Sequence, residues 1–414
     1  MRVDLYIARR LRLTDSNGNR TRTSIRIATA GVVLSIVIML ITMAITSGFK
    51  HEIINKLIGF DSELTVEAQA FDVISPQPFV EDADEVMAIV SEVFPDAVVE
   101  ESIKVPAMLK TDDDFSAVVL SAYGGQGNAG FIAGNIIEGA VPDAGENPNA
   151  VIISAEVAGR LGLSVGDKIN TCFFASEKMR IRNFEVAAIY DSGFGEYDRV
   201  VAYAPLATLR KVAGVPDGCV QAVAVNGLPA EHITQAQETL QDAFRDAYYA
   251  RTLAQYLEVG SVVQSGAVYF NWLSLLDTNV VVILVLMTAI SAFTLIASLI
   301  ILILERVNMI GTLKILGATN ATIRRIFILL DLKVLVKGLV TGNLLALALI
   351  FIQQYTRVLP LDPESYYIAF VPVRITLLQV IALNVGAIVV ATAIMVLPSM
   401  IISRLKPAAI LRYE

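Results

Sequence analysis

The sequence lacks the phosphate loop by which many ATPases hold nucleotides. It contains no GxxxxGK[ST] pattern, so it does not offer the combination of backbone amides, lysine and hydroxyl that binds nucleotide phosphates and magnesium. Gly124, Gly125 and Gly127 are typical of a flexible connection instead. We therefore expect a non-catalytic chain without cofactor-binding residues, which depends on a partner for any use of ATP.

Residues that bind metals are also few. The two histidines, His51 and His232, are far apart, and no histidine, cysteine or carboxylate cluster has the spacing of a metal site. Asp112–Asp114 could hold a hard cation, but three acidic residues between two predicted strands are more typical of a solvated turn. Cys172 and Cys219 leave two alternatives open, a disulfide or two small buried apolar side chains. We predict no metal site.

Charge is scarce and unevenly distributed along the chain. Of the 414 residues, 55% are hydrophobic and 17% are charged, which is too apolar for a soluble protein. Residues 49–278 contain 33 acidic and 14 basic side chains, whereas the rest of the chain contains 7 and 18. An acidic, water-exposed domain and basic segments beside membrane spans explain this division. No basic surface for nucleic acid is indicated.

Four long apolar runs are typical of transmembrane helices, because each is long enough to cross about 30 Å of hydrocarbon. A basic N-terminus precedes the first run, which is longer than the usual core of a signal peptide. Cytoplasmic segments are rich in lysine and arginine, so both termini are predicted to be cytoplasmic. The predicted division is 1–26 N-terminus, 27–48 first span, 49–278 external domain, 279–304 second span, 305–327 cytoplasmic segment, 328–352 third span, 353–374 external loop, 375–402 fourth span and 403–414 tail.

The third span has charges at one end. Asp331, Lys333 and Lys337 lie at or just inside its cytoplasmic end, where lysines can extend back to the lipid headgroups. An intramembrane ion pathway is the alternative, although it would also need charges near the middle of the membrane. Gly338 and Gly342 form a small-xxx-small face on which a neighbouring helix could pack closely.

The external domain alternates strand-like and helix-like segments. Its start is predicted to be strand, helix, strand and strand, in SELTVEAQA, EDADEVMAIVSEVF, AVVEESIKVPAML and FSAVVLSAYG. A further strand and helix occur at 221–249, and residues 130–213 contain short strands separated by turn residues. The residues therefore predict a large α+β domain with a β-rich insertion, on an α-helical membrane protein with four transmembrane helices.

The cytoplasmic segment 305–327 is a polar island between the second and third spans. An apolar helix face is indicated by residues spaced i, i+4 and i+7, with one more beside them: Met309, Leu313, Leu316 and Ile310. Gly317 suits the left-handed conformation that ends such a helix, and Thr319 or Asn320 can cap the helix that follows. A capped amphipathic helix between two spans is predicted to contact something outside the membrane.

Both the order of the segments and several local motifs point to one family. One span, a large external domain and three further spans follow each other along the chain. The motifs are SGFKHEIINKLIGFDSELTV after the first span, ERVNMIGTLKILGAT in the island, YYIAFVPV at 366–373 and KPAAILRYE at the C-terminus. They resemble the FtsX-like permease family of ABC transporters, which includes macrolide-exporter (MacB-type) and lipoprotein-releasing (LolC/LolE-type) membrane subunits. The lipoprotein-releasing subunits are the most similar, over nearly the whole chain.

This resemblance implies a permease subunit that works with a separate cytoplasmic ATPase of the LolD type, which would bind the ATP and Mg²⁺. The island would be the coupling helix that docks on the ATPase. Its implied contact residues are Glu305, Met309, Ile310, Leu313, Lys314, Leu316 and Gly317. The external domain would be a MacB-type periplasmic core, with porter halves at about 60–125 and 215–255 and a sabre-like insert at about 130–213.

A substrate and further partners are implied by the same resemblance. A lipoprotein would be drawn from the outer leaflet of the bacterial inner membrane, between this chain and a second permease subunit that is the same chain or a related one. The lipid-facing substrate cleft would lie near the first and second spans, and a LolA-like periplasmic carrier would receive the lipoprotein.

The segment TCFFASEKMRIR departs from the LolC pattern. LolC-type subunits have an extended carrier-binding hook at this place, and the segment here is short. This favours a LolE-like role or a different division of labour. The alternatives to lipoprotein release are a MacB-like export or mechanotransmission permease and an FtsX-like regulator of cell-wall hydrolases.

Overall fold

Two compact units make up the part of the chain that the computed structural model describes, residues 19–69, 78–125, 127–143, 145, 147–175, 178–362 and 366–399. A helical unit takes its described residues from Met1–Lys50, Leu273–Pro360 and Phe370–Glu414, and a large domain takes its residues from His51–Trp272 and Leu361–Ala369. Residues 1–18 and the predicted tail 403–414, with its KPAAILRYE motif, lie outside the described residues.

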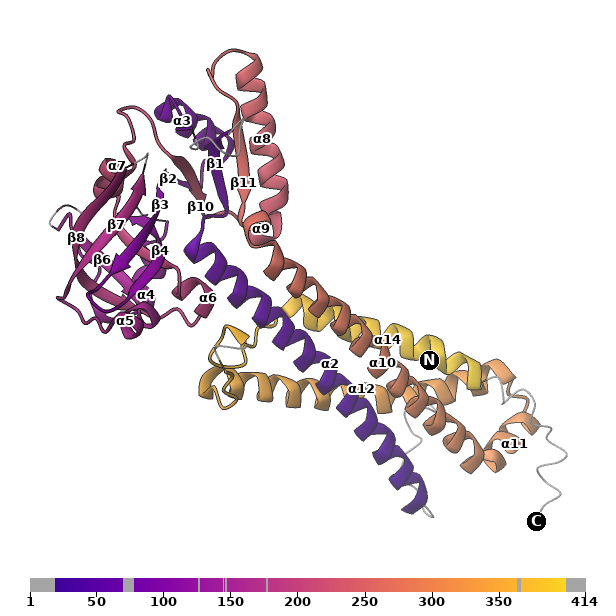
Figure 1. The fold of residues 1–414 in the computed structure, drawn as a ribbon. Helices are drawn as coiled ribbons and strands as arrows, with labels where there is room; N and C mark the ends of the chain where they lie inside the picture. The colour runs from indigo at the N-terminus through magenta and orange to yellow at the C-terminus, as the bar shows by residue number, and fades with distance from the viewer. Residues whose placement is uncertain are drawn as a thin grey trace. The chain divides into compact units, whose positions relative to one another are not determined.

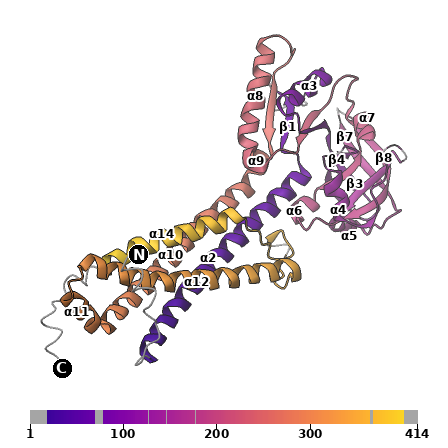
Figure 2. The ribbon, with the colours of Figure 1, turned by 180° about the vertical axis from the view of Figure 1, so that it is seen from behind.

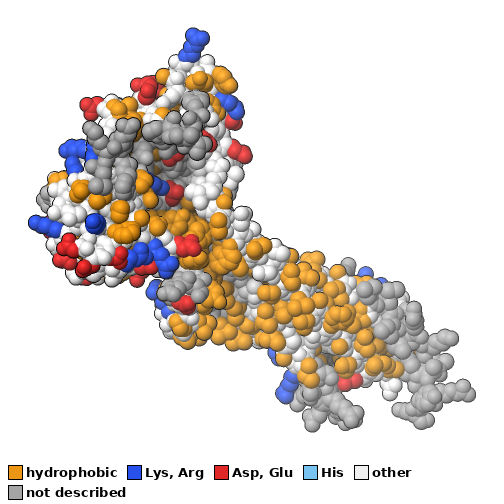
Figure 3. Space-filling model, in the orientation of Figure 1, with side chains coloured by type: hydrophobic (Ala, Val, Ile, Leu, Met, Phe, Trp, Pro, Cys, Tyr) orange, Lys and Arg blue, Asp and Glu red, His pale blue; other side chains and the backbone are white. Residues whose placement is uncertain are grey.

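Four long helices carry the apolar runs: α2 (Asn19–Phe60), α10 (Ala267–Glu305), α12 (Asn320–Thr356) and α14 (Leu377–Ser399) (Figure 1). Each contains a stretch long and apolar enough to cross a membrane, as predicted. Many apolar side chains on them are exposed, including Phe293 at 73% and Leu344 at 65%, and Figure 3 shows hydrophobic side chains gathered along the helices. Such a surface is stable in lipid rather than in water. Helix α2 continues to Phe60, past the predicted end of the first span at residue 48.

Small residues allow the helices of the helical unit to approach closely. A Cβ atom added to Gly338 of α12 would lie 2.6 Å from Cγ1 of Val32 on α2, and a Cβ atom added to Gly342 would lie 3.0 Å from Cβ of Ile36. The small-xxx-small face predicted for the third span therefore packs against the first. A buried apolar cluster that includes Leu40 and Phe327 fills the remaining space in this bundle.

Amide side chains connect α12 to the segments that follow it. Asn343 donates to Oδ1 of Asn384 on α14 at 2.7 Å, and Asn384 donates back to Oδ1 of Asn343 at 2.9 Å. Near the end of α12, Gln353 donates to the Val371 carbonyl and accepts from the Leu359 amide. Because unpaired amides are costly in a membrane, these reciprocal bonds fix α12 and α14 in one register.

The large domain contains a four-stranded antiparallel sheet in the order β11-β1-β10-β2. Its strands are β1 (Leu64–Ala68), β2 (Val98–Ser102), β10 (Ala222–Asn226) and β11 (Leu257–Ser261). Two amphipathic helices pack on it, α3 (Ala83–Val93) and α8 (Ile233–Tyr249), and Figures 1 and 2 both show α8 lying along β11. Leu240 and Phe244 are among the residues that α8 buries. The short η1 (Ala230–His232) precedes α8, and α9 (Val262–Ser265) follows β11.

A seven-stranded sheet forms the second part of the large domain, in the order β5-β8-β6-β9-β4-β3-β7. Its strands are β3 (Lys104–Lys110), β4 (Phe115–Tyr123), β5 (Ile136–Gly139), β6 (Ala150–Ser154), β7 (Lys168–Ala175), β8 (Lys178–Tyr190) and β9 (Val201–Pro205). The long strand β8 pairs with both β6 and β7, so the sheet closes on itself into a barrel. Ile153, Phe173 and Phe184 are in its buried core. The helices of this part are α4 (Ala129–Asn135), α5 (Ala155–Leu161), α6 (Gly195–Asp198) and α7 (Leu206–Ala213).

The structure places one boundary of the large domain differently from the sequence. The predicted order of strand, helix, strand and strand is confirmed in β1, α3, β2, β3 and β4, because the second predicted strand segment divides into β2 and β3 at Ile103. However, β3 and β4 belong to the barrel and not to the sheet of β1. Strand β11 was not predicted. Alternation of apolar side chains identifies a strand but not the strand with which it pairs.

Candidate functional site

The polar island folds as the short helix α11 (Val307–Ile315) between α10 and α12. Gly317 follows it with φ +86°, the left-handed conformation expected at this position. The Thr319 hydroxyl accepts a hydrogen bond from the Thr322 amide at 3.2 Å, so Thr319 caps α12. The predicted stop and start signals are both confirmed, and they allow the chain to leave one long helix and enter the next through a defined turn.

Contacts of α11 divide the seven predicted docking residues into three groups. Ile310 is completely buried in the apolar cluster of the bundle. Met309 and Leu313 are half-buried against the same cluster, and Lys314 is half-buried. Glu305, Leu316 and Gly317 are exposed, Leu316 at 82%. Most of the apolar face of α11 therefore lies on its own bundle.

The outward face of α11 is mixed in character. Asn308 and Thr312 are exposed one helical turn apart, and Ile315 is 60% exposed near Leu316 at the end of the helix. Two aliphatic side chains beside a polar stripe form a small surface for a partner to cover. Ile315 was not among the predicted docking residues, because it does not follow the i, i+4, i+7 spacing of Met309, Leu313 and Leu316.

The charged residues at the start of the third span separate in the structure. Lys333 and Lys337 are exposed, as extension toward headgroups requires. Asp331, in contrast, is completely buried. A buried acid and two exposed lysines thus lie within two turns of one another on α12.

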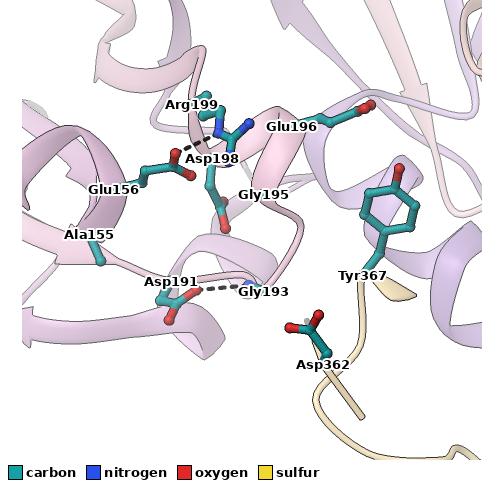
Figure 4. A pocket seen from close by; sticks show the side chains of 10 residues that line it. All are labelled: Ala155, Glu156, Asp191, Gly193, Gly195, Glu196, Asp198, Arg199, Asp362 and Tyr367. Carbon is teal, nitrogen blue, oxygen red and sulfur yellow. Dashed lines mark hydrogen bonds and ion pairs between the residues drawn. The ribbon is translucent and has the colours of Figure 1, made fainter. Parts of the chain in front are cut away.

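A pocket of about 570 Å³ lies in the large domain beside α6 (Figure 4). It is lined by acidic residues of the barrel and by the loop 361–369, whose Asp362 and Tyr367 face the segment 191–199 in Figure 4. At its edge Arg199 pairs with Glu156 at 2.5 Å. The Asp191 carboxylate accepts a hydrogen bond from the Gly193 amide at 2.9 Å. These acidic groups therefore hold their own loop in place.

Asp198 organises this loop from within. Its carboxylate accepts hydrogen bonds from the Ser192 hydroxyl at 2.7 Å and the Phe194 amide at 3.2 Å, and its backbone carbonyl accepts one from the Ser154 hydroxyl. Burial raises the pKa of Asp198 above its ordinary value, and the hydrogen bonds oppose this increase. The segment 191–199 is thus a pre-formed part of the barrel surface.

Two further predictions concern the large domain. Cys172 is buried, Cys219 is half-buried, and the two thiols are free in the structure. Asp112–Asp114 form an exposed turn between β3 and β4, in which the Asp114 amide and carbonyl bond with Thr111. The predicted solvated turn is confirmed.

Two family models together match most of the chain. The MacB-like periplasmic core domain matches residues 27–243, and the FtsX-like permease C-terminal model matches residues 281–407. The first therefore includes the barrel and three strands of the four-stranded sheet, β1, β2 and β10, and the second includes α11, α12 and α14.

Curated relatives agree with these matches. The chain is 23% identical over 405 residues to the lipoprotein-releasing system transmembrane protein LolC of Xylella fastidiosa (strain 9a5c), covering 93% of this chain and 92% of that protein. It is 27% identical over 193 residues to LolE of Haemophilus influenzae, covering 44% and 46%. The periplasmic region of MacB from Actinobacillus actinomycetemcomitans superposes with a TM-score of 0.33 at 11% identity, covering 53% of this chain and 98% of that one. The chain belongs to the FtsX-like permease family of ABC transporters, as a member with four apolar spanning helices and a MacB-like periplasmic core domain.

Proposed function

We propose that this chain is the permease subunit of an ABC transporter that extracts lipoproteins from the outer leaflet of the bacterial inner membrane. The proposal is carried by the similarity to a lipoprotein-releasing subunit over 93% of the chain. That similarity includes the helical unit as well as the large domain, so it does not rest on the shared core domain alone. The ATP and Mg²⁺ bind to a separate cytoplasmic ATPase, and both termini of this chain are cytoplasmic.

Helix α11 is the proposed docking site of the ATPase. Burial of Ile310 and half-burial of Met309 and Leu313 attach α11 to the bundle, while the exposed Leu316 and Ile315 remain available to a partner. One side of α11 thus contacts the membrane helices and the other contacts the ATPase. A short helix held in this way passes a displacement of the ATPase to α10 and α12.

Truncation of Leu316 tests the docking surface. We expect Leu316 to be one of the few contact residues whose truncation costs more than about 1 kcal/mol, so Leu316→Ala should weaken binding of the ATPase about tenfold. Leu359→Ala is the matched control, since Leu359 is also exposed, at 54%, but follows the other end of α12. Affinity is measured with purified ATPase and the full chain in detergent or nanodiscs. Equal affinities for the two variants would contradict the assignment.

Ile310→Ala separates docking from attachment. Ile310 is fully buried, so its truncation should destabilise the bundle by about 2–5 kcal/mol and should not primarily lower ATPase affinity. The midpoint temperature of thermal aggregation measures the loss of stability. The affinity for the ATPase is measured separately, at a temperature at which the variant remains folded. If Ile310→Ala lowered affinity without a change in the midpoint, the buried face would be the docking face.

Depletion of the chain in its native bacterium tests the cargo. The proposal requires acylated proteins to accumulate in the inner-membrane fraction, which mass spectrometry of separated membranes measures. The MacB-like core domain supports export of a soluble peptide or small molecule as the second candidate. Unchanged lipoprotein distribution together with increased sensitivity to an exported compound would favour that candidate.

The remaining partners follow from the same proposal. A second permease subunit, identical or related, completes a substrate cleft near α2 and α10, and a periplasmic carrier receives the lipoprotein. Strands β7 and β8 pair as far as Ala175 and Lys178, so only two residues connect them. A connection this short leaves no extended hook, which supports a LolE-like division of labour.

A further inference from the structure

The barrel has no direct chain connection to the long helices. Strand β1 begins at Leu64, shortly after α2 ends at Phe60, and α10 begins at Ala267, shortly after β11 ends at Ser261. The four-stranded sheet is therefore joined to both helices by short connections. The barrel is inserted between β2 and β10 of that sheet. Its position relative to the helix segments 51–60 and 267–272 of the same unit must then be set by non-covalent contacts.

An aromatic cluster supplies these contacts. Phe194 of the barrel is completely buried, and its ring centroid lies 5.1 Å from that of Tyr269 on α10, 5.0 Å from that of Tyr367 in the loop 361–369, and 6.3 Å from that of Phe60 on α2. Phe60 is also 4.9 Å from Phe131 of α4. We call Phe60, Phe131, Phe194, Tyr197, Tyr269 and Tyr367 the Phe194 cluster.

Lys56 of α2 adds two polar contacts to the Phe194 cluster. Its ammonium group donates hydrogen bonds to the backbone carbonyls of Ser192, at 2.6 Å, and Tyr367, at 2.9 Å. One side chain thus joins three segments that are far apart in the sequence. Tyr367 has φ +59°, a left-handed conformation that is uncommon for a tyrosine and that needs such contacts to persist.

The barrel core is separate from this contact. The buried residues that fill the barrel, including Ile153, Phe173 and Phe184, form a cluster to which neither Phe194 nor Tyr367 belongs. The segment 191–199 also keeps its shape through the bonds of Asp198, which lie within the barrel. The contact can therefore open without unfolding the barrel.

We propose that the Phe194 cluster and Lys56 form a detachable latch, which makes the barrel move as one body with the ends of α2 and α10 and with the loop 361–369. This inference rests on the proposed function, where a movement of the membrane helices must reach the domain that handles the lipoprotein. With the latch closed, such a movement is passed to the barrel. With the latch open, the helices move and the barrel stays behind.

Hydrogen exchange of the full chain tests the latch directly. Lys56→Met removes both hydrogen bonds and keeps most of the aliphatic stem. Because hydrogen bonds to a charged group contribute more than neutral ones, the variant should speed amide exchange in 191–198 and 361–369 about tenfold or more. Lys56→Arg keeps the charge and the donors and should restore slow exchange. Lys110→Met, at an exposed lysine at the end of β3, is the matched control and should leave both segments unchanged.

Two exchange results would overturn the latch. One is unchanged exchange in both segments of Lys56→Met. The other is faster exchange throughout the barrel, including 150–154, which would show general destabilisation instead of a local opening.

Coupling in the reconstituted transporter, with ATPase and carrier, is the second measurement. Lys56→Met should retain ATP hydrolysis but release several-fold less lipoprotein per ATP, and Lys56→Arg should recover most of this ratio. An unchanged ratio in Lys56→Met would contradict the latch. If the unmodified transporter released no lipoprotein, the proposed function would fail, while the exchange measurement would still decide whether the latch exists.

Discussion

The helical unit and the large domain are each stabilised internally, and the kinds of contact differ between them. In the helical unit, Gly338 and Gly342 allow α12 to lie against α2, and one reciprocal amide pair joins α12 to α14. In the large domain, charged side chains hold segments in place. Examples are the Arg210–Glu101 ion pair, which joins segments that are distant in the sequence, and the hydrogen bond from Ser192 to the Asp198 carboxylate within one loop.

The difference follows from the solvent of each unit. Lipid tails are as apolar as leucine, so helices in a membrane gain little from burying apolar surface and depend on close packing and hydrogen bonds. The large domain folds in water, where buried apolar area contributes most and charged groups can be placed at edges. The helical unit should therefore respond to changes of shape, and the large domain to changes of charge.

Gly338→Val should give the largest effect and break the packing of α2 on α12. The new Cβ would lie 2.6 Å from Cγ1 of Val32, and overpacking of this kind costs about 3 kcal/mol. Thermal aggregation of the purified chain in detergent measures the loss. Gly386→Val on α14 is the control, because a Cβ there meets no described atom within 4 Å. A similar midpoint for both variants would contradict the close contact.

Arg210→Ala should give the next largest effect, in the large domain. Arg210 donates from Nη1 to both carboxylate oxygens of Glu101, at 2.6 and 2.7 Å, and from Nη2 to the carbonyls of Pro216 and Cys219. Its loss leaves a mostly buried carboxylate without this partner, which costs about 2 kcal/mol.

Proteolysis across a urea series reports the stability of the Arg210→Ala variant. The control is Arg245→Ala, whose ion pair with Asp242 is exposed at the surface, so its removal should cost less than about 0.5 kcal/mol. An equal loss of stability in the two arginine variants would contradict a specific contribution from the contact of Arg210 with Glu101.

The amide pair should contribute less than either of these. Asn343→Leu and Asn384→Leu, with the double variant, form a cycle whose coupling free energy should be about 1 kcal/mol, as for other hydrogen bonds between membrane helices. The midpoint of thermal unfolding in detergent gives each value. A coupling energy of zero would mean that each amide finds another partner when the pair is broken.

A pH series should give the smallest effect and should separate the two units. A carboxyl whose folded pKa is raised adds stability that is fully present below the ordinary pKa and is lost as the pH rises through the folded pKa. Burial gives Asp198 such a raised pKa. Acidification from neutral pH should therefore stabilise the large domain of the unmodified chain more than that of Asp198→Asn. The urea concentration at the midpoint of unfolding, followed across the pH series, measures this difference. Gly338→Val lies in the helical unit, so it should leave the pH dependence of the large domain's stability unchanged. A weaker pH dependence in this variant would contradict the view that the two units respond to different changes.

Local signals in the sequence predicted the features that depend on neighbouring residues. Gly162 ends helix α5 (Ala155–Leu161) with φ +65°, the left-handed conformation that a glycine favours after a short helix. The same holds for Gly317 and Thr319 beside α11, because a turn glycine or a cap acts within a few residues of its own position.

Features that depend on distant residues could not be predicted in this way. The spacing of Met309 and Leu313 identified an apolar face but not the surface that would cover it, and both turned toward the bundle. Pairing of β3 and β4 with barrel strands is likewise set by packing across the domain. The Phe194 cluster draws on five separate segments, and no short motif connects Phe60, Phe194 and Tyr367.

The end of the β7–β8 hairpin gives the family room to change. Both strands are paired as far as Ala175 and Lys178, so the ladder between them is complete before the connection begins. Inserting residues there would cost only the slowly growing entropy of a longer loop. The hairpin end is therefore the point at which the barrel would tolerate a longer connection without a change in its own strand pairing.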